Sequence, residues 1–216
     1  NRARIHLEII KKCREEVGSD FAISIKMNSA DFQKGGFSPE DSIQVAKLFS
    51  DSGIDNIEIS GGTYEQPRLL GLDKVSINPK RSESRKESTI AREAYFLSYA
   101  EEIAKVVNIP LMVTGGFRTK EGMEAALANG ACEIVGVGRP LCANPYAIKE
   151  LLAGQIYELP KYEKTLSIGP WWLSQTSPFR LIQAINAFSA QAWFYQQIKK
   201  MGKGLMPDLN LKPWKA

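Results

Sequence analysis

The residues of this chain that could bind an anion lie in two glycine turns within residues 110–145. Gly115 and Gly116 follow an apolar run that is typical of a short strand, and Gly138 and Arg139 follow a second such run. Glycine lets the backbone approach an anion closely, amides in a turn donate to it, and arginine can pair with it bidentately. Two such turns at the ends of neighbouring parallel strands predict a phosphate site. The alternative is an ordinary βαβ unit whose glycines only make tight turns.

Lys26 is the second candidate for chemistry. It lies near the carboxyl end of the segment Phe21–Met27, in which Ser24 and Lys26 share the polar face of an alternating pattern. Parallel strands are normally apolar on both faces, so a polar face near a strand end indicates the catalytic face of a barrel. The alternative is that Lys26 pairs with a core carboxylate or extends its amine to solvent.

Four strand–helix units would position these residues. Apolar runs and helical periodicity predict strands at Phe21–Met27, Ile54–Ser60, Leu111–Thr114 and Glu133–Val137, and helices at Arg4–Val17, Ser38–Ser52, Ser88–Val107, Thr119–Asn129, Asn144–Leu152 and Phe179–Lys200. We expect the first helix to bury Ile5, Ile9 and Val17, and the last to align Ile182, Ile185, Phe188 and Ala192. The fold class is therefore α/β. Four βα units are half of the eight that close a TIM barrel, so we expect part of a (β/α)8 barrel followed by a helical tail.

Composition places the chain among globular proteins and excludes several functions. It has 216 residues, 44% hydrophobic and 24% charged, with a formal net charge of +4. That charge is too mild to indicate nucleic acid, and no apolar run approaches the roughly 20 residues that span a bilayer. Cys13, Cys132 and Cys142 have no metal-binding spacing and favour a reducing compartment, so we expect a cytoplasmic protein without a metal site.

The longest irregular stretch, residues 63–88, would lie over the mouth of a barrel. A loop of this length is usually either a functional lid or a surface segment with no role, and the sequence leaves both open. We expect the barrel part to cover residues 1–154. Residues 155–216 are expected to form a helical, aromatic-rich extension that packs on the barrel.

The motifs on these strands resemble the old yellow enzyme family of FMN-dependent NAD(P)H oxidoreductases, in the branch called NADH:flavin oxidoreductase/NADH oxidase. The similar stretches are NRAR at Asn1–Arg4, IKMNSADFQKGGFS at Ile25–Ser38, EISGGTYEQP at Glu58–Pro67, REAYFLSYA at Arg92–Ala100, MVTGGFR at Met112–Arg118 and VGVGRPLCANP at Val135–Pro145. They follow one another in unbroken order over about the first 150 residues. The resemblance implies that the chain supplies the C-terminal half of an FMN-binding barrel.

The resemblance also assigns roles to the glycine turns. Gly115 and Gly116 would offer backbone N–H groups to the FMN phosphate, and Phe117 would lie against the cofactor. Gly138 would complete the phosphate site together with Arg139, its charged partner.

Lys26 takes the place of the basic residue beside flavin N1, where many family members have arginine. Gly61, Gly62 and Tyr64 would border the substrate side of the barrel mouth. His6, the one histidine, falls outside the motif that binds the substrate carbonyl in this family.

The function that the resemblance implies is the reduction of activated alkenes, such as α,β-unsaturated carbonyl compounds, or of related acceptors, with NAD(P)H as reductant and FMN as cofactor. The carbonyl-binding pair and the proton donor belong to the first half of the barrel, so we expect this chain to be inactive alone. Its partners would be a small-molecule substrate and either an N-terminal half-barrel or further copies of itself, with no nucleic acid or membrane. Two alternatives remain: a phosphate-binding barrel isomerase or lyase with Lys26 as Schiff-base or general-base residue, and a non-catalytic half-barrel.

Overall fold

The structure is a computed structural model that describes residues 1–31, 35–60 and 96–216. The described residues form two compact units. The first contains the chain up to Phe117 and again from Glu121 to Gly136, and the second contains Arg118–Lys120 and Val137–Ala216. Each unit is described by itself.

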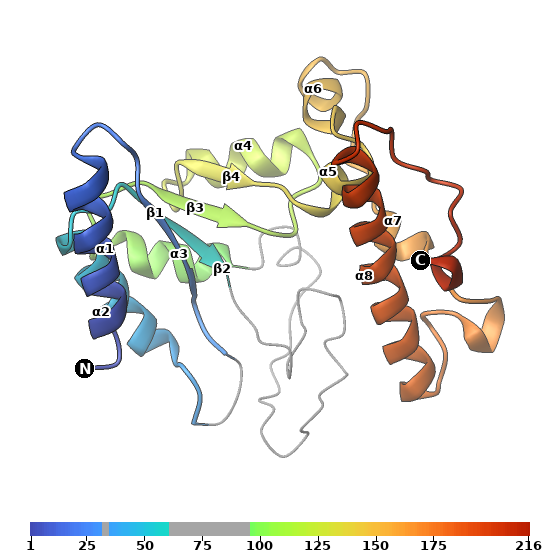
Figure 1. Ribbon diagram of the computed structural model, residues 1–216, viewed down its shortest axis with the longest axis horizontal. Helices are drawn as coiled ribbons and strands as arrows, with labels where there is room; N and C mark the ends of the chain where they lie inside the picture. Colours follow the sequence, from blue (N-terminus) through green and yellow to red (C-terminus); the bar gives the residue numbers. More distant parts are fainter. Residues whose placement is uncertain (32–34, 61–95) are drawn as a thin grey trace. The chain divides into compact units, whose positions relative to one another are not determined.

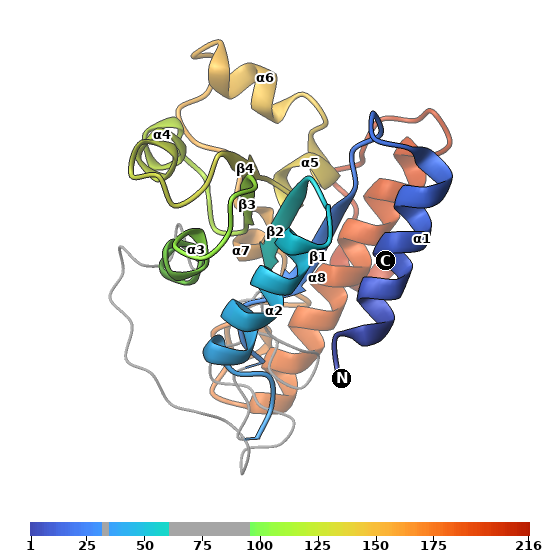
Figure 2. The ribbon, with the colours of Figure 1, turned by 90° about the vertical axis from the view of Figure 1, so that its left-hand side faces the viewer.

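The first unit is built on a parallel sheet of four strands in the order of the chain. Its strands are β1 (Ser24–Asn28), β2 (Asn56–Ser60), β3 (Leu111–Thr114) and β4 (Ile134–Gly136), and its helices are α1 (Arg4–Val17), α2 (Pro39–Asp51), α3 (Leu97–Ala104) and α4 (Lys120–Ala128). The helices α2, α3 and α4 follow the sheet in the order of the strands (Figure 1). Figure 2 shows α3 and α4 on the same side of the strands. This is the arrangement of successive βα units in a barrel wall, and it confirms the expected partial α/β barrel.

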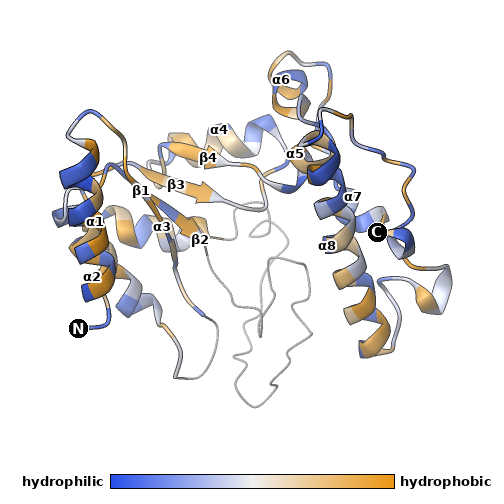
Figure 3. Ribbon diagram, in the orientation of Figure 1, coloured by the Kyte–Doolittle hydropathy of each residue, from blue (hydrophilic) through white to orange (hydrophobic). Residues whose placement is uncertain are grey.

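The core of the first unit lies between the sheet and its helices. The strands β3 and β4 are largely apolar along their lengths (Figure 3). The side chains of Ile57, Ile59 and Val113 are fully buried, together with Phe96 and Ile103 beside and on α3. Residues that are buried on this face alternate with more exposed ones, which is the period expected of a strand.

The start of α2 follows directly from the sequence. Ser38 is the N-cap and Pro39 the first helical residue. The Asp41 amide donates to Ser38 Oγ over 3.1 Å, and the Ser38 amide donates back to Asp41 Oδ2 over 3.2 Å. This reciprocal pair is a capping box, and it satisfies two amide donors that a helix start would otherwise leave open.

The prediction of which residues of α1 are buried is wrong. Ile5, Ile9 and Val17 are 63%, 53% and 42% exposed, and Ile10 is the buried residue of this helix. Ala3, Leu7 and Ile10 pack against the core of the unit instead. At the end of the helix, the Arg14 guanidinium donates to Gly53 O over 2.8 Å and to Asp55 Oδ2 over 2.6 Å.

The second unit is helical. It contains α5 (Arg139–Ala143), α6 (Ala147–Leu152), α7 (Tyr162–Thr165), the 3-10 turn η4 (Trp171–Leu173), α8 (Arg180–Met201) and the 3-10 turn η5 (Pro213–Lys215). Its apolar cluster centres on Trp193, which is 1% exposed and packs edge-on against Phe194. The described part of the chain has no helix that is long and apolar enough to cross a membrane.

The long helix α8 buries a different face from the predicted one, and this face carries Ala190, Trp193 and Phe194. Phe188 and Ile185 are 64% and 39% exposed, whereas Asn186 and Gln197 are buried. The Asn186 amide donates to Leu173 O over 2.9 Å and accepts from the Ile168 amide over 2.9 Å. Gln197 likewise binds the backbone of Asp208. Buried amides therefore hold the irregular segments before and after α8, on the same face as the buried apolar side chains of Trp193 and Phe194.

Candidate functional site

The first unit places the predicted glycine turn at the carboxyl edge of its sheet. β3 and β4 pair in parallel, with Thr114 opposite Gly136. Gly115 and Gly116 follow Thr114 with φ values of 121° and 85°. Side chains other than glycine rarely adopt this part of conformational space, so both positions need glycine for the turn. Amides in such a turn can donate to an anion that lies beyond the strand end.

Two hydroxyl groups near this edge lack a partner. Thr114 Oγ1 and Ser29 Oγ are buried and make no hydrogen bond within the part of the chain that the structure describes. Thr114 ends β3, and Ser29 directly follows β1. A buried hydroxyl without a partner costs free energy unless a ligand or water satisfies it, so the edge suits a ligand with polar atoms.

Lys26 lies on the polar face of β1 and β2. Its Nζ is 2.7 Å from Glu58 Oε1, and the next polar pair of the same face joins Ser24 Oγ to Asn56 Oδ1 over 2.8 Å. The Lys26 side chain is 56% exposed and that of Glu58 19%. The structure thus shows the pairing that the sequence left as an alternative, on a face where the amine remains accessible. A role of Lys26 in chemistry stays a prediction.

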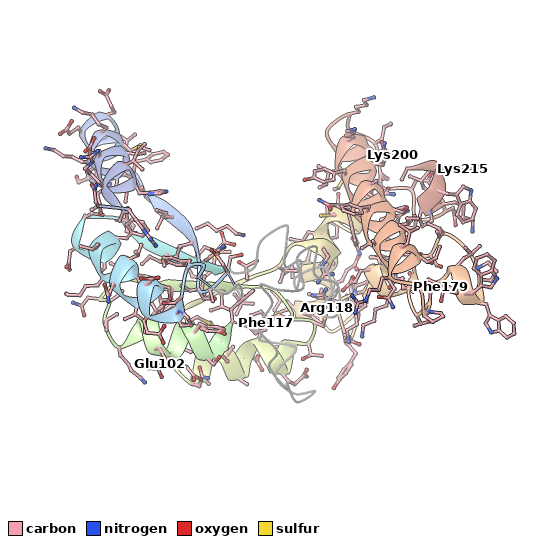
Figure 4. All side chains as sticks on the ribbon, turned by 90° about the horizontal axis from the view of Figure 1, so that it is seen from below. Glu102, Phe117, Arg118, Phe179, Lys200 and Lys215 are labelled. Atoms are coloured by element: carbon pink, nitrogen blue, oxygen red, sulfur yellow. The ribbon has the colours of Figure 1, made fainter. Side chains whose placement is uncertain are left out.

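The second unit contains a cluster of three charged side chains. Arg118 Nη2 donates to Glu163 Oε1 over 2.7 Å, and Arg139 Nη1 lies 3.5 Å from the same oxygen. Arg118 (labelled in Figure 4) is 5% exposed. Glu163 Oε2 is buried and has no hydrogen-bond partner among the residues that the structure describes. Two guanidinium groups and one carboxylate leave this cluster with one net positive charge.

Short local structures hold each member of the cluster. The Arg118 carbonyl accepts from the Leu159 amide over 2.7 Å. Arg139 is the first residue of α5, after Gly138 as N-cap. Glu163 lies on the single turn of α7, where the Gln175 side-chain amide donates to the carbonyls of Glu163 and Leu166. The charged groups therefore come from three separate segments.

The environment shifts the titration of two members of the cluster. Burial lowers the pKa of the Arg139 guanidinium, and Arg118 adds to this effect while Glu163 opposes it. Burial by itself would raise the pKa of the Glu163 carboxyl, but the charges of Arg139 and Arg118 outweigh it and hold this pKa below its usual value. Both shifts follow from charged groups that lie close together in a partly buried site.

A cavity of about 310 Å³ opens beside this cluster within the second unit. Arg139, Glu163 and Cys142 form part of its wall, and side chains of α8 such as Phe194 and Ile198 form an apolar part. Burial raises the pKa of the Cys142 thiol. The cavity combines one charged end with an apolar wall, as small-molecule sites commonly do.

The remaining predicted site residues have different outcomes. Gly61, Gly62 and Tyr64 lie outside the described residues, as does the loop over residues 63–88. Phe117 is 1% exposed and belongs to the core cluster of the first unit, so its contact with a cofactor stays a prediction. Gly115 and Gly116 belong to the first unit and Gly138 and Arg139 to the second.

Sequence reasoning missed Arg118 and Glu163. Arg118 is the last residue of the similar stretch Met112–Arg118, and its place so close to the glycine turn is a signal that could have identified it. Glu163 lies 45 residues further along the chain, in a segment without a motif. The pairing of Glu163 with Arg118 could be found only from the folded structure.

Comparison with known proteins places the chain in a family. The sequence profile of the NADH:flavin oxidoreductase / NADH oxidase family matches residues 1–156. The NADH-dependent flavin oxidoreductase iliE of Hypocrea jecorina is 37% identical over 183 residues, which cover 81% of this chain and 42% of that protein. The chain thus spans less than half the length of this relative.

Solved structures agree on the fold. The 2-naphthoyl-CoA reductase in complex with 2-naphthoyl-CoA is 26% identical, with a TM-score of 0.60 over 77% of this chain and 23% of that one. The old yellow enzyme homologue from Zymomonas mobilis is 19% identical, with a TM-score of 0.50 over 73% of this chain and 38% of that one. The second likeness concerns the fold alone.

These similarities extend over the strands, the glycine turn and the start of α5. FMN and NAD(P)H are the cofactor and reductant that the family and its relatives indicate. The chain therefore belongs to the NADH:flavin oxidoreductase / NADH oxidase family, the family of the old yellow enzymes.

Proposed function

We propose that this chain forms the phosphate-binding half of an FMN-dependent NAD(P)H oxidoreductase that reduces activated alkenes, such as α,β-unsaturated carbonyl compounds, or related acceptors. One observation carries the proposal. In a chain of this family, the turn after β3 is built from two glycines with left-handed backbone conformations. Such a turn is the backbone feature that lets amides reach a phosphate.

Each residue has a defined task in this proposal. The amides of Gly115 and Gly116 donate to the phosphate of the flavin nucleotide, and Arg139, with Gly138 before it, supplies the balancing charge. Phe117 holds the turn by its place in the core. When bound, FMN supplies the capacity to accept a hydride from NAD(P)H and to deliver it to an acceptor.

Lys26 supplies a positive charge on the accessible polar face of β1. A cation beside the N1 edge of the flavin would stabilise negative charge that develops there during reduction. Its ion pair with Glu58 holds the amine in place on the strand. The same pair engages the amine with a carboxylate, and the chain belongs to a family of oxidoreductases. The oxidoreductase proposal is therefore better supported than the isomerase or lyase alternative.

We also propose that the 216-residue chain does not turn over substrate by itself. The described part of the chain provides four strands of the eight that a closed barrel needs. A complementary half-barrel would add the remaining strands together with the groups that bind the substrate carbonyl and donate a proton.

The test compares two polypeptides. One is the 216-residue chain, and the other joins it to the N-terminal half-barrel of a family member. We expect the joined polypeptide to be yellow, to contain about one FMN per chain, and to oxidise NADH when an α,β-unsaturated ketone is added. The chain alone should show no such turnover. A well-folded joined polypeptide that is colourless and does not take up added FMN would exclude the proposal.

A further inference from the structure

The cluster of Arg118, Arg139 and Glu163 is an incomplete ion pair. Both arginines use the same carboxylate oxygen, Oε1, at 2.7 and 3.5 Å. The second oxygen, Oε2, is buried and has no hydrogen-bond partner among the described residues. A guanidinium and a carboxylate that are permanent partners commonly use two parallel bonds. The geometry here leaves Arg139 weakly held, at the longer of the two distances.

The charges of the cluster are also unbalanced. With Glu163 in place, the two arginines carry one positive charge in excess. A phosphate monoester carries about two negative charges at neutral pH, so it is a stronger partner for Arg139 than the Glu163 oxygen that lies 3.5 Å away. Phosphate and Glu163 therefore compete for the same positive charge.

The cavity in the second unit gives an anion access to Arg139. Arg139 and Glu163 both line it, and the Arg139 side chain is 31% exposed whereas that of Arg118 is 6% exposed. An anion that enters can reach Arg139 first. Arg118 can keep its shorter bond to Glu163 during the exchange, so the carboxylate is not stranded without a partner.

We propose that Glu163 is an internal counterion that a phosphate monoester displaces from Arg139. Glu163 holds the arginine in the absence of ligand and weakens phosphate binding by competing for it. The identification of that phosphate as the one of FMN rests on the proposed function, whereas the exchange at Arg139 does not. Free phosphate and the phosphate of a nucleotide share the chemistry and are separated by the test.

The test measures phosphate binding to the 216-residue chain and to its variant Glu163→Gln. The probes are inorganic phosphate, FMN, and riboflavin as the flavin without phosphate, each studied by calorimetry at constant ionic strength. The variant Glu158→Gln is the matched control. Glu158 is a partly exposed carboxylate of the same unit that pairs with Lys161.

Removing the competing negative charge should lower the Kd for inorganic phosphate at least about tenfold in Glu163→Gln. The interaction free energy of two unit charges in contact in a partly buried site is larger than the free energy that corresponds to a tenfold change in Kd. Glu158→Gln should leave the Kd within about twofold. If FMN is the natural ligand, its Kd should fall in parallel while that of riboflavin stays unchanged. A fall for phosphate without any FMN binding would support the exchange and exclude the proposed cofactor.

The proposal would be overturned by equal phosphate affinity in Glu163→Gln and the unchanged chain, or by weaker binding in the variant. Weaker binding would mean that Glu163 is a structural partner that positions Arg139. FMN binding with an unchanged Kd in the variant would reject the exchange and retain the cofactor.

The variant could also unfold, because it leaves two cations close together. Phosphate should then restore folding of Glu163→Gln, detected by circular dichroism, at concentrations where sodium chloride of equal ionic strength does not. In that case Glu163→Asp, whose shorter side chain reaches Arg139 less well, should bind phosphate more tightly than the unchanged chain. Failure of both results would reject the proposal.

Discussion

Arg14 and Asp55 show how single residues fix the elements of the first unit. The Arg14 guanidinium donates to Gly18 O, Phe21 O and Gly53 O over 2.7–2.8 Å and to Asp55 Oδ2 over 2.6 Å. The same carboxylate oxygen accepts from the Ile23 amide over 2.7 Å. These bonds join the end of α1 to the segments that lead into β1 and β2. The hydrogen bond from Ile23, followed by that from Arg14, lowers the pKa of the Asp55 carboxyl.

This lowered pKa predicts how stability depends on pH. The unfolded chain binds the Asp55 proton more tightly than the folded chain, so the stabilisation is complete above about pH 4 and is lost as pH falls through the lower folded pKa. We expect Asp55→Asn to lower the free energy of unfolding by about 1 kcal/mol at pH 6, because the side chain is 44% exposed and its bonds are screened. Below pH 3 the difference should shrink.

Urea unfolding at pH 6, 4 and 2.5 measures this effect. Asp51→Asn is a suitable control, because Asp51 is exposed and its nearest cation, Lys47, lies 3.4 Å away on the same helix. A gap between Asp55→Asn and the unchanged chain that stays constant over this pH range would contradict the account.

At the scale of elements, the pairing of β3 with β4 depends on Gly136. A Cβ atom at this position would lie 2.0 Å from Thr114 Oγ1 and 2.7 Å from Met112 Cε. Both atoms belong to β3, the strand that leads into the glycine turn. The absence of a side chain at Gly136 therefore lets the two strands keep the register that positions this turn.

Gly136→Ala should destabilise the chain by about 1–3 kcal/mol, the usual effect of forcing extra atoms into a packed site. Gly138→Ala is the matched control. Gly138 has a φ of −111°, and nothing lies within 4 Å of its added Cβ. Its free energy of unfolding should change by less than about 0.5 kcal/mol. Similar effects of the two variants in urea unfolding would show that this contact does not control the strand pairing.

The elements also show what the sequence could and could not predict. The four strands and the helices α1, α2, α4 and α8 were predicted from apolar runs and from signals such as the Ser38–Asp41 capping box, which depend on neighbouring residues only. The short helices α5 and α7 were not predicted. The covered faces of α1 and α8 did not follow, because each helix has apolar residues on more than one face. The helix α1 buries Ile10 and exposes Ile9, and α8 buries Trp193 and exposes Phe188. Apolar periodicity indicates which faces of a helix can be buried, and the tertiary contacts select among them.

At the scale of the whole molecule, the same distinction applies to the candidate site. The glycine turns could be predicted because the chemistry lies within a few consecutive residues. The cluster of Arg118, Arg139 and Glu163 could not, because Glu163 comes from a segment 45 residues after Arg118. The family and the half-barrel fold were confirmed by comparison with known proteins. The boundary expected after residue 154 and the roles of the site residues stay predictions.

The central proposal is that this chain binds the phosphate group of a flavin nucleotide, with Arg139 as its charged partner. The most direct test titrates the chain with FMN and with riboflavin and follows the flavin fluorescence. We expect FMN to bind at least about tenfold more tightly than riboflavin, a difference of about 1.4 kcal/mol. In Arg139→Ala this preference should disappear. Equal affinity for the two flavins in the unchanged chain, or a preference that survives in Arg139→Ala, would contradict the claim.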